Sequence, residues 1–188
     1  MGGDLYSGFD ELITCEESGK DFRISIQDVG SSVTIIAPHG GKIEPRTSDI
    51  AKKIAKNNFN YYCFEGIKKD NNGSLHITSH RFDEPSAIRL LFNSDVVVAI
   101  HACTGNASLV HIGGLDKALT EVIADALEAG GIKVSKAHPR FRGVNPDNIC
   151  NRGRTKMGVQ LEVTRDLRDD LRKVEVISRA VRAALKTV

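Results

Sequence analysis

The chain has 188 residues, 40% of them hydrophobic and 27% charged, which is enough for one compact domain with a sizeable core. Its formal net charge of +2 is too small to indicate nucleic-acid or membrane binding through bulk electrostatics. The four cysteines form no C-x-x-C pair, which excludes a zinc ribbon or a thioredoxin motif. With no signal peptide, no long apolar run and no need for a disulfide, we expect a protein made in the cytoplasm.

The first elements predicted are two strands and a helix. Residues 22–27 alternate polar and apolar side chains, as a half-exposed strand does, whereas the apolar residues 33–37 predict a buried strand. Ser48 can cap a helix that runs to about Lys56. Residues 1–20 show no comparable pattern, and we expect them to be irregular or peripheral.

The middle of the chain contains the strongest strand pattern. Residues 60–64 and 75–79 are strand candidates on either side of an Asn-Asn-Gly turn. Pro85 suits the first turn of a helix that ends near Phe92. Residues 95–100, with the sequence DVVVAI, predict a fully buried strand.

The last third of the chain continues the alternation of helices and strands. Residues 115–129 and 169–186 carry apolar side chains at helical spacing, and residues 132–136 and 158–164 resemble strands. Strands that alternate with helices predict an α/β fold with helices on both faces of one sheet. Because no repeat or linker divides the chain, we expect residues 1–188 to form a single domain.

Two of the predicted buried strands are each followed by a histidine, His39 and His101. Ligands of open α/β sheets bind beyond the carboxyl ends of strands, so parallel neighbouring strands would bring these imidazoles together. Gly40 and Gly41 would let the backbone turn so that Glu44 reaches His39. Two imidazole nitrogens and one carboxylate oxygen are the ligand set of a catalytic zinc site. By spacing alone, however, an ordinary loop or core histidine stays an alternative, because H-x-x-x-x-E is not a zinc signature.

The glycine-rich loop fits neither nucleotide binding nor serine hydrolysis. The chain lacks G-x-x-x-x-G-K-[ST], G-x-G-x-x-G after a strand, and the G-x-S-x-G elbow. Metal-assisted hydrolysis is therefore the leading interpretation, and it requires a group that transfers a proton. Glu162 is the candidate, since a carboxylate among apolar residues of a strand is costly unless it is used or paired. A solvated edge position, or an ion pair with Arg165, is the alternative.

Several motifs, in the same order along the chain, resemble the poly-γ-glutamate hydrolase family of phages and prophages: APHGGKIEP, ITSHRFDEP, IHACTGN with VHIGGLD, and NICNRGRTKMGVQLEV. The resemblance covers about residues 30 to 168 and implies a mixed central sheet flanked by helices, an open sandwich similar to zinc carboxypeptidases. It also implies cleavage of the γ-amide bonds of poly-γ-glutamate. Carried over to this chain, it places one Zn²⁺ on His39, Glu44 and His101 and makes Glu162 the catalytic glutamate.

The resemblance also implies that arginine holds the substrate carboxylate. Zinc carboxypeptidases use an arginine and an Asn-Arg pair for this purpose, and this chain has such a pair, although it follows the second histidine instead of preceding it. Guanidinium groups bind carboxylates in a bidentate manner. The expected substrate-binding residues are Arg142, Arg152, Arg154, Arg165, Asn151 and His80.

Other functions remain open at this point. A zinc amidohydrolase or carboxypeptidase that acts on a small peptide or acyl-amino acid would use the same ligands. A non-catalytic protein that binds acidic polymers would need no metal. For the leading interpretation, we expect a monomer that contacts neither nucleic acid nor membrane and that reaches an external polymer after lytic release.

Overall fold

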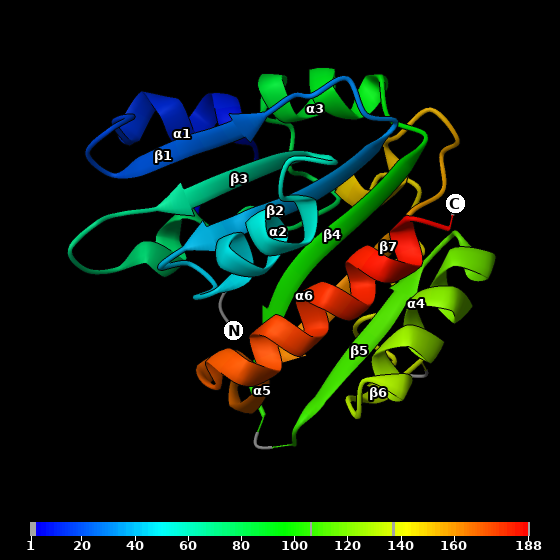
Figure 1. Ribbon diagram of the computed structural model, residues 1–188. Helices are drawn as coiled ribbons and strands as arrows, with labels where there is room; N and C mark the ends of the chain where they lie inside the picture. Colours follow the sequence, from blue (N-terminus) through cyan, green and yellow to red (C-terminus); the bar gives the residue numbers. More distant parts are fainter. Residues whose placement is uncertain (1–2, 106, 137, 188) are drawn as a thin grey trace.

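The structure, a computed structural model, describes residues 3–105, 107–136 and 138–187. Within these residues a seven-stranded sheet has the strand order β1-β3-β2-β4-β7-β5-β6 (Figure 1). The strands are β1 (Phe22–Gln27), β2 (Val33–Gly41), β3 (Asn60–Gly66), β4 (Val96–Cys103), β5 (Leu109–Gly114), β6 (Lys133–Ser135) and β7 (Val159–Thr164).

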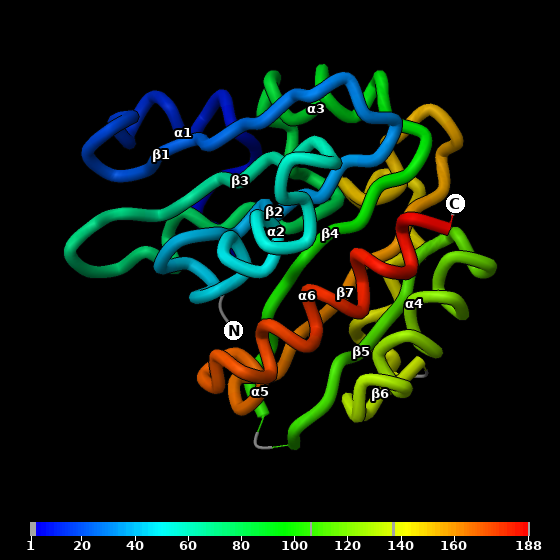
Figure 2. Tube along the Cα trace, viewed as in Figure 1, coloured from blue at the N-terminus to red at the C-terminus, as the bar shows by residue number. Residues whose placement is uncertain are grey.

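The sheet is mixed. Strands β3, β2, β4 and β7 lie next to one another in that order and run parallel. At one side β1 is antiparallel to β3, and at the other side β5 is antiparallel to β7 and carries β6 parallel to itself. Because parallel strands end at the same edge, the carboxyl ends of β2, β4 and β7 meet there. In Figure 2 this edge faces the lower left, where the carboxyl ends of β2 and β4 lie together with the short helix α5 (Arg165–Asp169) that follows β7.

Helices cover both faces of the sheet. On one face lie α2 (Thr47–Ala55), α4 (Lys117–Ala129) and α6 (Leu171–Leu185), and on the other lie α1 (Phe9–Cys15) and α3 (Pro85–Phe92) (Figure 1). Among the described residues, no helix combines the length and apolarity that crossing a bilayer requires.

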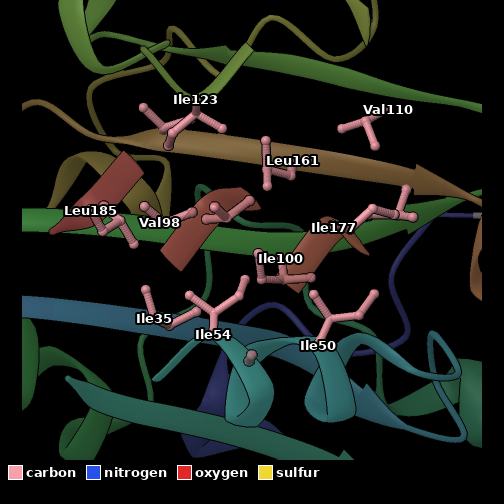
Figure 3. Close-up of a cluster of buried hydrophobic side chains, with 14 of the residues drawn as sticks. Ile35, Ile50, Ile54, Val98, Ile100, Val110, Ile123, Leu161, Ile177 and Leu185 are labelled. Carbon is pink, nitrogen blue, oxygen red and sulfur yellow. The ribbon is translucent and has the colours of Figure 1, made fainter. Parts of the chain in front are cut away.

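The alternation of side chains along β4 and β7 decides which way the site faces. Val98, Ile100 and Leu161 are fully buried in the core under α2, α4 and α6, where Figure 3 shows them among side chains of these helices. Each such buried side chain contributes about 1.5–3 kcal/mol. Since successive side chains of a strand point to opposite faces, His101 and Glu162 point to the other face of the sheet.

Two strands extend farther than the sequence predicts. β2 continues through Pro38 and His39 to Gly41, and β4 continues through His101 to Cys103. The register of β2 against β3 shifts between Ala37 and Gly40, because proline has no N–H to donate to the ladder. Both histidines therefore lie in the last residues of their strands and not in the loops behind them.

The prediction of a strand at residues 75–79 is wrong. A 3₁₀-helix, η1 (Asn72–Leu75), ends there, and an irregular segment follows. Conversely, β5 was not predicted, because its Gly113 and Gly114 resemble a turn. A Cβ at Gly114 would lie 2.0 Å from the carbonyl oxygen of Gly158, so this glycine permits close packing of β5 against β7.

The ends of the chain also differ from the expectation. Residues 9–15 form α1, whose Phe9 and Leu12 are buried. The predicted last helix is present as α6, and the short helix α5 precedes it without having been indicated by the sequence. The carboxylate of Asp170 caps α6 by accepting from the backbone N–H of Arg172.

Candidate metal centre and active site

His39, Glu44 and His101 lie together at the carboxyl edge of β2 and β4. The Nδ1 atoms of the two histidines are 3.2 Å apart. Oε1 of Glu44 is 3.4 Å from Nδ1 of His39, and its Oε2 is 3.7 Å from Nδ1 of His101. Each residue offers a ligand atom within 4.8 Å of the other two, so the three side chains could hold one metal ion.

The spacing of these atoms fits zinc. Ligand atoms at about 2.0–2.1 Å from Zn²⁺ in tetrahedral geometry lie roughly 3.3 Å from one another. The separation of 3.2 Å between the two nitrogens and that of 3.4 Å between His39 and Glu44 agree with this value, and the third, 3.7 Å, is slightly longer. Three protein ligands would leave the fourth position of a tetrahedral ion open, as in catalytic zinc sites and unlike structural ones.

A tight loop after β2 brings Glu44 back to the histidines. The backbone N–H of Glu44 donates to the carbonyl of His39 at 2.8 Å. Gly41 has φ +64°, and a Cβ there would lie 2.4 Å from the carbonyl oxygen of Gly66, so only glycine fits. Oε2 of Glu44 also accepts from the backbone N–H of Ala102 at 2.9 Å. Although burial raises the pKa of Glu44, the imidazoles of His39 and His101 outweigh it and hold that pKa below its usual value.

The outer nitrogen of each imidazole also has a partner. Nε2 of His39 is 2.8 Å from the carbonyl oxygen of Ile77. A carbonyl can only accept, so Nε2 carries the proton and Nδ1 keeps its lone pair for a metal. Nε2 of His101 lies 3.3 Å from the hydroxyl of Ser79. Sequence reasoning missed this support because it assigned these residues to a strand.

Glu162 lies beside the cluster. It is opposite His101 in the register of β4 and β7, and opposite His111 in the register of β5 and β7. Burial raises the pKa of Glu162 to about 7, although the charge of His101 opposes the shift. A carboxyl group with a pKa near neutrality can both accept and return a proton at neutral pH.

Two of the predicted substrate-binding residues hydrogen-bond the chain itself. The guanidinium of Arg152 donates to the backbone carbonyls of Asp147, Phe82 and His80, at 2.9, 2.9 and 3.0 Å. Asn151 is fully buried, and its amide donates to two carbonyls and accepts from one backbone N–H. These bonds shape the loop before β7, so a role in binding substrate stays a prediction for both residues.

The other four predicted substrate-binding residues lie in different places. Arg154 donates to both carboxylate oxygens of Asp95, at 2.8 and 2.6 Å, just before β4 begins. Because a strand rises about 3.3 Å per residue, His101 lies roughly 20 Å farther along β4. Arg165 is exposed at the start of α5, directly after β7. Arg142 and His80 are also exposed, in the loops before η2 (Ile149–Asn151) and after η1.

Sequence reasoning missed a group of residues on the far side of Glu162. The rings of His138 and Phe141 stack with their centroids 4.3 Å apart, and His111 lies 4.5 Å from His138. The charge of Arg140, in the same loop, lowers the pKa of Glu162 and opposes the effect of burial. The sequence HPRF at 138–141 is the signal that could have indicated this loop.

The sequence also does not indicate the position of Arg168, because this residue belongs to a run of basic residues that is typical of a surface. It is only 4% exposed. Its guanidinium donates to the carbonyls of Val163, Pro45 and Cys103, at 3.0, 2.6 and 3.3 Å. Arg168 thereby joins the carboxyl ends of β4 and β7 to the loop that carries Glu44.

Comparison with known proteins gives the family. Residues 6–186 match the family model described as poly-gamma-glutamate hydrolase. The chain belongs to the poly-gamma-glutamate hydrolase family. Among curated proteins, YmaC of Bacillus subtilis (strain 168) is 38% identical over 169 residues, which are 88% of this chain and 71% of YmaC.

Solved structures of similar proteins have the same fold. A bacteriophage poly-gamma-glutamate hydrolase is 27% identical, with a TM-score of 0.92 over 98% of this chain and 97% of the phage chain. A zinc-free apo structure of YndL is 29% identical, with a TM-score of 0.90 over 97% of this chain and 98% of that chain. The family resemblance and the predicted mixed sheet with helices on both faces are therefore confirmed.

Proposed function

We propose that this chain is a zinc-dependent hydrolase that cleaves the γ-amide bonds of poly-γ-glutamate. The observation that carries the proposal is the convergence of His39, Glu44 and His101 beside Glu162, in a member of the poly-gamma-glutamate hydrolase family. The choice of zinc is supported by the separations of the three ligand atoms and by the zinc-free form in which the apo structure of YndL is described.

The proposed roles follow from the positions of the side chains. His39 and His101 would hold the ion through Nδ1, and Glu44 through a carboxylate oxygen. Bound Zn²⁺ supplies Lewis-acid activation of water and of the scissile carbonyl. Glu162 would accept a proton from the attacking water and return it to the departing amide nitrogen, and the pKa near 7 that burial gives it suits both steps.

Arginines whose side chains are exposed would bind the polymer. Each γ-linked glutamate keeps a free α-carboxylate, which a guanidinium binds well. Arg165 and Arg142 are exposed, and Arg140 lies close enough to Glu162 for its positive charge to lower the pKa of that carboxyl group. We therefore favour these three residues over Arg152 and Arg154, whose guanidinium groups are bonded to the chain itself.

Cleavage of the polymer in the presence and absence of a chelator tests this function. We expect high-molecular-weight poly-γ-glutamate to become shorter, the chelator to stop the reaction, and added zinc to restore it. Chain length can be followed by size-exclusion chromatography. No shortening under any metal condition would contradict the proposal, whereas shortening that survives the chelator would contradict the role of zinc.

A further inference from the structure

One short segment, residues 76–79, supports both imidazoles of the candidate metal centre from outside. The carbonyl of Ile77 accepts from Nε2 of His39 at 2.8 Å, and the hydroxyl of Ser79 lies 3.3 Å from Nε2 of His101. The side chains of both histidines are only 3% exposed, so water cannot readily replace these partners. The position of this segment therefore determines how the two rings are oriented.

The segment is irregular, and the side chain of Asp4 fixes its first half. The carboxylate of Asp4 accepts from the backbone N–H of Thr78 at 2.7 Å, and it also bonds Nδ1 of His76 at 2.7 Å and the guanidinium of Arg81 at 2.6 Å. The side chain of Asp4 is only 5% exposed. Hydrogen bonds to a charged group are stronger than those between two neutral groups, so the carboxylate of Asp4 holds the segment firmly in place.

The ring of His76 connects Asp4 to the candidate metal centre. The imidazole of His76 packs on that of His39, with centroids 4.0 Å apart and planes inclined by 32°. Asp4 thus reaches His39 by two routes: through the carbonyl of Ile77 and through the ring of His76. The second half of the segment has its own support, since the backbone N–H of Ile149 donates to the carbonyl of Ser79 at 2.9 Å.

We propose that Asp4 is a positioning residue for metal binding, which keeps Nδ1 of His39 directed at the metal position. Asp4 precedes residue 6, where the match to the family begins, so no family motif indicates it. The inference rests on the proposed zinc site. Loss of a partner behind a metal-binding histidine typically lowers metal affinity by about 10–100-fold.

The rate of zinc release to a chelator tests this role on the full chain. We expect Asp4→Ala to release zinc about 10–100-fold faster than the wild type. Asp4→Asn should lie between them, because its amide oxygen can still accept from the N–H of Thr78. Asp10→Asn is the matched control: Asp10 is exposed on α1, and its substitution should leave the release rate unchanged.

The metal-free protein gives a second, independent readout. The Nε2–H of His39, bonded to Ile77, should appear as a slowly exchanging imidazole proton in the NMR spectrum of the wild type and should be lost in Asp4→Ala. Thermal unfolding of both metal-free proteins shows whether the variant keeps its fold. Zinc release within about twofold of the wild type, together with an unchanged imidazole proton, would overturn the inference.

The two proposals fail in different ways. A wild type that binds no zinc contradicts the proposed function and the role of Asp4 in metal binding, and the imidazole proton then shows only whether Asp4 orients the ring of His39. A wild type that binds zinc, with a variant that releases it equally slowly and keeps the imidazole proton, contradicts only the role of Asp4.

Discussion

The two ends of β4 both carry ionisable side chains, but these side chains are arranged differently. At the amino end, Arg154 binds both carboxylate oxygens of Asp95 in a pair that is largely exposed and satisfied by its own members. At the carboxyl end, two nitrogens and a carboxylate converge on one another at 3.2–3.7 Å, and both imidazoles are buried. The exposed pair at the amino end is satisfied by its own members, whereas the buried groups at the carboxyl end offer three converging ligand atoms that could hold a metal ion.

The largest effect is expected at the carboxyl end. His39→Ala removes one of three ligands and leaves a buried cavity beside the other two, so we expect the loss of stoichiometric zinc and of metal-dependent cleavage. Metal content by atomic emission and chain length of the polymer measure the two losses. A variant that kept one zinc per chain would mean that the ligand set is wrong and that this end of β4 has no special arrangement.

An intermediate effect is expected at Arg168, whose guanidinium donates to three carbonyls at the carboxyl ends of β4 and β7 and in the loop that carries Glu44. Arg168→Ala leaves these buried carbonyls without the guanidinium that donates to them. The free energy of unfolding, measured with urea, should therefore be about 2–4 kcal/mol lower than that of the wild type. A loss below about 1 kcal/mol would show that water replaces the guanidinium and that the edge is less closed than its 4% exposure indicates.

The smallest effect is expected at the amino end. Arg154→Ala breaks an exposed ion pair, which is worth about 0–1 kcal/mol, and lies roughly 20 Å from His101. Stability should fall by no more than this amount, and cleavage of the polymer should be unchanged. A large rise in the KM for the polymer would instead show that Arg154 binds substrate, and the two ends of β4 would then not differ in function.

Much of the carboxyl end could be predicted from local sequence. The apolar runs before His39 and His101 identify two buried strands, and alternation in β7 places Glu162 on the face opposite to Leu161. Those patterns depend only on near neighbours in the chain. The strand ends were less predictable, because Pro38 interrupts the ladder although β2 continues beyond it.

Residues whose role depends on distant contacts could not be predicted. Asp4 meets Thr78 only in the folded chain, and Arg168 is buried only because the ends of β4 and β7 and the loop at Pro45 surround it. Gly113 and Gly114 in β5 have the composition of a turn, yet they allow two backbones to approach closely. In each case tertiary contacts override what the local sequence indicates.

Glu162→Gln tests the central claim most directly, because it separates holding the metal from transferring the proton. The substituted amide keeps the size of the side chain but cannot accept a proton. Zinc content and polymer cleavage should be measured on the same sample. We predict one zinc per chain with cleavage reduced by about 10²–10⁴-fold. Full zinc with unchanged cleavage would contradict the assignment of Glu162 as the proton-transferring group.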